Sequence, residues 1–187
     1  MNILKQIKNL FTGASPAKAV SCNFIFPYAT DPEVKRKQIW ENLQKGLLFE
    51  DTGVLIPWTA TYMEIHRIAV KRRDSGDRTN YFLGEHNILD GFHSFVGVMK
   101  WADKKSNEPF MYTDEYLGTD DVGNEKFLML KDKLTALLGT PNRIDLEKFG
   151  HNDIGSIEWQ QGEIIISLTG IEQFACKYRM YIGLDAD

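Results

Sequence analysis

The chain has 187 residues, of which 43% are hydrophobic and 26% are charged, with 15 Gly and 6 Pro. This composition excludes the fibrous, collagen-like and disordered classes, and the length suffices for one domain that folds without a disulfide or a metal. The 22 Lys and Arg against 26 Asp and Glu give a net charge of −4, which does not favour the binding of nucleic-acid phosphates. We therefore expect a compact protein with no nucleic-acid partner.

The N-terminal segment predicts an amphipathic helix followed by a linker, together spanning residues 1–18. Apolar residues recur there at helical spacing, but lysines interrupt them too often for a signal peptide and are too few for stable membrane anchoring. Cys22 lacks the apolar stretch that lipidation requires, and Cys22 and Cys176 have no metal-like spacing. We expect a cytoplasmic protein whose residues 19–187 form a single α+β domain, without a cofactor.

The first part of that domain is expected to alternate between strand and helix. Residues 23–28 are aromatic and β-branched, which predicts a strand with Pro27 at its end or edge. Asp31 is placed as the N-cap of a helix that begins at Pro32 and stops at Gly46. Residues 47–49 and 54–58 predict a hairpin around an Asp-Thr-Gly turn.

A second helix, from residue 62 to about residue 70, is indicated by Thr61 and Glu64, which have the spacing of a capping box. Residues 71–80 are polar and predict a solvated loop, while strands are expected at 81–83 and 92–101. In the latter, alternation places His93, Phe95, Gly97, Met99 and Trp101 on one face.

Residues 103–125 carry seven acids against two lysines, a local net charge of −5, together with several aromatic residues. The best helical periodicity of the chain follows at residues 124–138 and ends at Gly139. Three antiparallel strands are expected at 156–160, 163–169 and 174–184. The predicted fold class is α+β, a mostly antiparallel sheet packed by three to four helices with a C-terminal β-meander. A helix leading into strands occurs twice, without a repeat of fixed period.

Candidate chemistry is sparse in this sequence. His86, Asp90 and His93 are the densest group of potential metal ligands, but their spacing matches no recurrent metal site, so turn residues and a strand histidine are the favoured interpretation. No motif of a hydrolase elbow, phosphate loop, dinucleotide fold or zinc helix occurs. Neither Cys176, on an expected core face, nor the paired carboxylates of the acidic stretch is expected to be catalytic.

Two patterns resemble a known kind of protein. They are Gly53–Trp58 leading into a capped helix, and residues 137–141 followed by Ile157-Glu158-Trp159 and antiparallel strands. They look like small uncharacterised bacterial α+β proteins, among them immunity proteins that neutralise contact-dependent or secreted toxins. The resemblance implies a cytoplasmic, non-enzymatic protein that binds one protein partner.

On that hypothesis the protein caps a toxin domain through an acidic surface that also contains aromatic side chains. Asp114, Glu115, Asp120 and Asp121 would supply charge, and Tyr112, Tyr116 and a partly exposed Trp58 would supply contact area. Two alternatives stay open. The first is an adaptor or secretion chaperone that holds an extended segment of a client, and the second is a metal-dependent enzyme centred on His86, Asp90 and His93. The sequence leaves the oligomeric state open.

Overall fold

The computed structural model describes residues 23–120, 125–149, 152–172 and 176–185. In this part of the chain the helices are α2 (Pro32–Leu43), α3 (Tyr62–Ile68) and α4 (Glu125–Leu138). A hairpin is formed by β1 (Gly46–Phe49) and β2 (Val54–Pro57), which pair with each other alone. The remaining strands are β3 (Lys71–Ser75), β4 (Arg78–Ile88), β5 (Phe92–Trp101), β6 (Tyr112–Asp120), β7 (Arg143–Phe149), β8 (Asn152–Gln161), β9 (Ile164–Glu172) and β10 (Cys176–Leu184).

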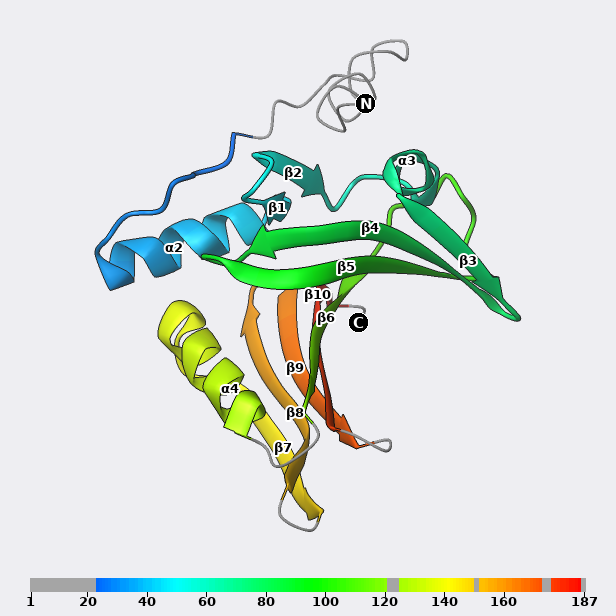
Figure 1. Ribbon diagram of the computed structural model, residues 1–187. Coiled ribbons are helices and arrows are strands. Elements are labelled where there is room, and N and C mark those ends of the chain that lie inside the picture. Colours follow the sequence, from blue (N-terminus) through cyan, green and yellow to red (C-terminus); the bar gives the residue numbers. More distant parts are fainter. Residues whose placement is uncertain (1–22, 121–124, 150–151, 173–175, 186–187) are drawn as a thin grey trace.

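These eight strands form one antiparallel sheet in the order β3-β4-β5-β6-β10-β9-β8-β7. Each half of the sheet is a run of four consecutive strands preceded by a helix, and the last strands of the two runs, β6 and β10, pair at the centre. The sheet is strongly curved. In Figure 1, β4 and β5 run across the view while β8, β9 and β10 run down it. The prediction that a helix leads into strands twice is confirmed.

The hydrophobic core lies on one face of this sheet. A single buried cluster joins sheet residues such as Tyr81, Val98 and Met180 to apolar side chains of all three helices and of the β1-β2 hairpin. Helices α2 and α4 lie side by side over this face (Figure 1), and Trp40 of α2 donates from Nε1 to the carbonyl of Leu138 at 3.2 Å. The described helices therefore all cover the same face, which we call the core face.

Local sequence signals explain where the helices begin. The Asp31 side chain accepts a hydrogen bond from the Val34 amide at 2.9 Å, which satisfies an amide that the helix itself leaves free. Thr61 and Glu64 form the complete capping box of α3. These two N-caps, the β1-β2 hairpin and the extent of α4 confirm the predictions.

The predicted fold class needs correction in its layout. The sheet is antiparallel and its C-terminal strands form a meander, as expected. That meander is only one half of a single eight-stranded sheet, whose other half comes from β3 to β6. The order also includes three strands that were not expected, β3, β6 and β7. Their sequences are rich in charged residues with low strand propensity, and pairing to neighbouring strands overrides that propensity.

Two predicted segments are wrong. Residues 71–80 are not a loop, because β3 and β4 form an exposed hairpin there around Gly76. Residues 23–28 are not a strand, because the backbone of Ile25 bonds the side chain of Asn42 instead of a neighbouring strand. The predicted N-terminal helix and the boundary at residue 18 lie outside the described residues.

Two glycines in strands are expected to respond oppositely to alanine. A Cβ at Gly46 would collide with the backbone carbonyl of Ile56, so Gly46→Ala should destabilise the protein by about 1–3 kcal/mol. A Cβ at Gly97 would come no closer than 3.4 Å to the Asp114 carbonyl, so Gly97→Ala should be neutral or stabilise by about 0.4–1 kcal/mol. Urea unfolding of the two variants measures both, and equal losses would contradict the expectation.

Candidate binding site on the open face of the sheet

The face of the sheet opposite the core face carries the candidate site. Burial alternates along β5, where Ser94, Val96 and Val98 are buried while Phe95 and Gly97 are only partly buried. Because directly paired residues share a face, Phe95 lies beside Tyr116, and Gly97 lies between Phe82 and Asp114. We call this side the open face, since the described helices pack on the other one.

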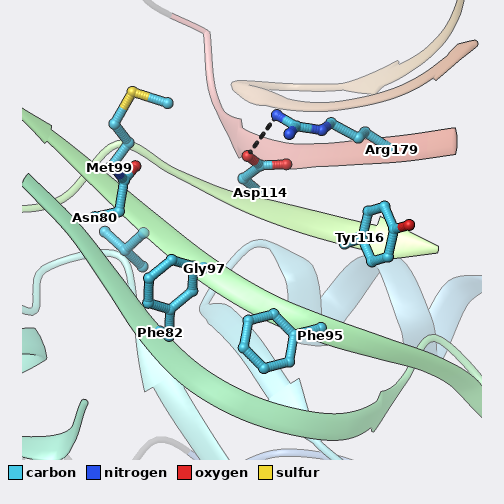
Figure 2. Close-up of a pocket in the computed structure, with 9 residues that line it drawn as sticks. Asn80, Phe82, Phe95, Gly97, Met99, Asp114, Tyr116 and Arg179 are labelled. Atoms are coloured by element: carbon cyan, nitrogen blue, oxygen red, sulfur yellow. Dashed lines mark hydrogen bonds and ion pairs between the residues drawn. The ribbon is translucent and has the colours of Figure 1, made fainter. Parts of the chain in front are cut away.

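A pocket of about 200 Å³ lies at the middle of the open face. Its lining comes from β4, β5, β6 and β10, and comprises Asn80, Phe82, Phe95, Gly97, Val98, Met99, Asp114, Tyr116 and Arg179. Figure 2 shows aromatic rings on one side and a carboxylate and a guanidinium at the other end. The pocket is therefore an apolar hollow with one polar end.

The aromatic wall is formed by three rings from neighbouring strands. Phe82 and Phe95 have ring centroids 5.5 Å apart and inclined at 44°. Tyr116 is directly opposite Phe95 on the next strand, and it is 40% exposed. Large aromatic side chains that stay exposed on a sheet lose apolar contact with the core, so their position favours a binding role.

Gly97 makes the hollow. Its backbone has no positive φ, and an added Cβ would have room, so the strand itself does not require a glycine here. A glycine inside a strand weakens the strand, and such glycines often mark a close approach by a ligand or another chain. The missing side chain leaves space between Phe82 and Asp114, which are the neighbours of Gly97 on either side.

The polar end consists of Asp114 and Arg179. Arg179 Nη1 donates to Asp114 Oδ2 at 3.2 Å, and the two side chains are 20% and 39% exposed for Asp114 and Arg179, respectively. Within the described part of the chain, Asp114 Oδ1 is buried and has no hydrogen-bond partner. Burial raises the pKa of Asp114, although the guanidinium of Arg179 opposes this shift. The charges of Asp114 and Arg179 cancel each other. The hydrogen bond between them uses only one lone pair of the carboxylate and one donor of the guanidinium.

Glu115 lies on the core face, behind this ion pair. Its side chain is fully buried, and Ser94 Oγ donates to Glu115 Oε2 at 2.7 Å. Burial raises the pKa of Glu115 to about 7, and the nearby Asp114 adds to the shift. Glu115 therefore cannot contribute charge to a surface that a partner would meet on the open face.

The structure brings together only part of the predicted acidic surface. Asp114 and Tyr116 line the pocket, and Tyr112 lies further along the same face, where its ring is 6.2 Å from that of Tyr181. Strand alternation sends Glu115 to the core face, which corrects its assignment to the binding surface. Asp120 ends β6, and Asp121 lies outside the described residues.

The expectation that Trp58 is partly exposed is also wrong. Trp58 is 5% exposed, its Nε1 donates to the carbonyl of Leu43 at 2.6 Å, and its ring lies 5.3 Å from that of Phe110. The side chain joins the β1-β2 hairpin to the end of α2 and to the segment before β6. It is part of the core rather than of a binding surface.

The three candidate metal ligands have separate partners. His86 Nδ1 is 3.1 Å from Asp51 Oδ2, Asp90 binds Lys35 at 2.7 Å, and His93 Nε2 is 3.8 Å from Glu85 Oε2. The His86 ring is also stacked on Phe49 at 3.8 Å between centroids. Among the described residues no group of three His, Cys, Asp or Glu side chains is arranged to hold a metal.

Sequence reasoning missed Phe82, Arg179 and the role of Gly97. One signal was available, because the predicted alternation put Phe95, Gly97 and Met99 on one face of their strand, and the structure confirms it. Which face the helices would cover was not visible from that alternation. The pocket also needs β6 next to β10, and these strands are far apart in the chain.

The fold and the site define a curved antiparallel sheet with helices on one face and an aromatic pocket on the other. Comparison with protein-family models, with curated proteins and with solved structures finds no match for this chain. Within the described ranges, none of the helices has the length and apolar character needed to cross a membrane.

Proposed function

We propose that this chain is a non-enzymatic, protein-binding protein whose partner docks on the open face of the sheet. The observation that carries the proposal is the group of partly exposed aromatic rings around Gly97, at the middle of that face. Aromatic residues and arginine dominate the energetics of protein interfaces, particularly near their centres. Phe82, Phe95, Tyr116 and Arg179 provide such a centre.

The size of the pocket supports a protein partner over a small-molecule substrate. Pockets that bind drug-sized ligands enclose about 300–1,000 Å³, whereas this one encloses about 200 Å³. A hollow of that size suits one side chain of a partner whose remaining surface covers the sheet around it. The cancelling charges of Asp114 and Arg179 give orientation rather than long-range attraction.

The partner class that we propose is a bacterial toxin domain, following the resemblance to immunity proteins. Binding on the open face would cap the toxin without any chemical step by this chain. The low cysteine content supports a reducing cytoplasm as the place where this occurs. The steering by a continuous acidic surface is not part of the proposal, because Glu115 is buried in the core.

The test is affinity purification of the tagged full chain from the cells that naturally make it, followed by native mass spectrometry. Tyr116→Ser removes an exposed ring of the open face, and the matched control Met129→Ser removes a 60% exposed side chain from α4. We expect a stoichiometric folded polypeptide with the wild type and with Met129→Ser, bound at least about 10-fold more weakly by Tyr116→Ser, a loss of about 1.4 kcal/mol. Equal binding by all three chains, or a partner that is absent, would overturn the proposal.

One observation favours the adaptor or secretion chaperone as a second candidate. Strand β7 is an edge of the sheet, and its Ile144 is 60% exposed, so this edge offers backbone groups and an apolar side chain to an extended peptide. Both edge strands, β3 and β7, carry charged residues, and β7 also exposes the apolar side chain of Ile144. An unfolded client lost in Ile144→Lys but retained in Tyr116→Ser would select this candidate.

A further inference from the structure

We propose that the pocket at Gly97 receives one tyrosine side chain of the partner, with its ring against Phe82, Phe95 and Tyr116 and its hydroxyl at Asp114 and Arg179. This inference rests on the proposed function, because it names the chemistry of the group that anchors the partner. It concerns only the pocket and can be tested without the partner.

The apolar part of the pocket matches an aromatic ring in size and surface. An apolar cavity of about 150 Å³ accepts benzene, and this pocket encloses about 200 Å³. Phe82, Phe95 and Tyr116 present ring faces and edges around it, and Met99 adds a thioether, which packs well against aromatic rings. Gly97 leaves the floor free of a side chain, so that a ring can approach the backbone of β5.

The polar end selects a neutral group that both donates and accepts hydrogen bonds. Asp114 Oδ2, which accepts from Arg179, keeps a further lone pair, and the partly exposed Arg179 has donors that Asp114 does not occupy. A phenol hydroxyl can donate to the carboxylate and accept from the guanidinium. A guanidinium or an ammonium ion from the partner would meet the like charge of Arg179, and a carboxylate would meet that of Asp114.

An aromatic ring without a hydroxyl group should be a poorer occupant of the pocket, because of the ion pair at its polar end. Closing the pocket over a toluene-like ring would bury Asp114 and Arg179 further from water without giving them a new partner. Leaving a buried polar group without a hydrogen bond costs about 1–3 kcal/mol. A ring with a hydroxyl avoids this cost, so it should bind several-fold more tightly than the same ring without one.

The test is a titration of the ¹⁵N-labelled full chain, followed by amide chemical shifts, with p-cresol as the tyrosine side-chain analogue. We expect saturable shifts confined to residues around Gly97, Tyr116 and Arg179, with a dissociation constant in the millimolar range, as expected for so few atoms. Toluene should bind at least about 3-fold more weakly. In Gly97→Val, whose side chain fills the hollow, p-cresol binding should fall at least 10-fold.

If Gly97→Val does not fold, two further variants still test the inference. Asp114→Asn should weaken p-cresol binding while leaving toluene binding unchanged, and Met129→Ser, far from the pocket on α4, should change neither. No saturable shift at the pocket, or toluene binding as tightly as p-cresol, overturns the inference. Tighter binding of n-propylguanidinium or of uridine would overturn it in favour of a cation site or a base-stacking site.

The result is separable from the proposed function. Binding of p-cresol to a chain that captures no folded partner would retain the pocket assignment and remove the partner. A partner that binds through Tyr116 in a chain that shows no p-cresol binding would retain the function and remove the tyrosine anchor.

Discussion

Trp159→Ala is expected to lower the free energy of unfolding by about 3–5 kcal/mol, the usual cost of deleting a large aromatic side chain from a core. Trp159 of β8 is 1% exposed and belongs to the buried cluster on the core face. Its Nε1 also donates to the carbonyl of Gly139 at 2.9 Å, directly after α4 ends. The side chain therefore both fills the core and holds the end of α4 against the sheet.

Urea unfolding followed by circular dichroism measures this loss, provided that the slope of free energy against urea stays the same as in the wild type. Trp159→Phe keeps most of the ring and loses the hydrogen bond to Gly139, so a smaller loss of about 1–2 kcal/mol is expected. Trp101→Ala is the matched control, because Trp101 is 38% exposed and should cost less than about 1 kcal/mol. If Trp159→Ala lost as little stability as the control Trp101→Ala, the end of α4 would not be docked on β8.

Stability is expected to fall as the pH rises from about 4.5 to about 7, because of Glu115. Burial raises its pKa to about 7 in the folded protein, compared with 4.5 for an unperturbed glutamate. The folded state then binds more protons than the unfolded state in this interval, so raising the pH favours unfolding. The shift corresponds to about 3 kcal/mol lost between the acidic and the alkaline side.

The matched variant is Glu115→Gln, which does not titrate and can still accept the hydrogen bond from Ser94 Oγ. Urea unfolding of both proteins between pH 4.5 and pH 8 gives their free energies of unfolding. As the pH rises, the free energy of unfolding of the wild type should fall steadily relative to that of Glu115→Gln. Burial also raises the pKa of Glu50, and the comparison between the two proteins removes its contribution. Asp114 interacts with Glu115, so the difference between the profiles reports the two neighbouring carboxyl groups together. Parallel pH profiles would contradict a buried, titrating Glu115.

Local signals in the sequence predicted the elements that local interactions define. The N-cap at Asp31 and the capping box of Thr61 and Glu64 depend on side chains and amides only three residues apart, so their spacing predicts them. Helix α4 shows the periodicity of one buried face, and its buried residues Phe127, Leu130, Leu134 and Leu138 follow it. These elements can therefore be predicted without knowing how the helices and strands pack together.

Strands without a local signature were not predicted. Strand β6 contains Asp114 and Glu115, whose side chains disfavour strands, and it forms because β5 and β10 pair with it on either side. Strand β10 is more than fifty residues away in the chain, and nothing in the spacing of the residues indicates that it would be the neighbour of β6. The central position of the pocket depends on this pairing.

The sequence by itself determined the starts of α2 and α3, the β1-β2 hairpin and which residues alternate along β5, because these depend on contacts between close neighbours. Only the tertiary structure decided which face of the sheet is covered. That decision buries Glu115 and leaves Tyr116 exposed, although the two are adjacent in the chain. The physical reason is that alternation separates the two faces of a strand but does not say which of them will be buried. The packing of α2, α3 and α4 buries one face and leaves the other open.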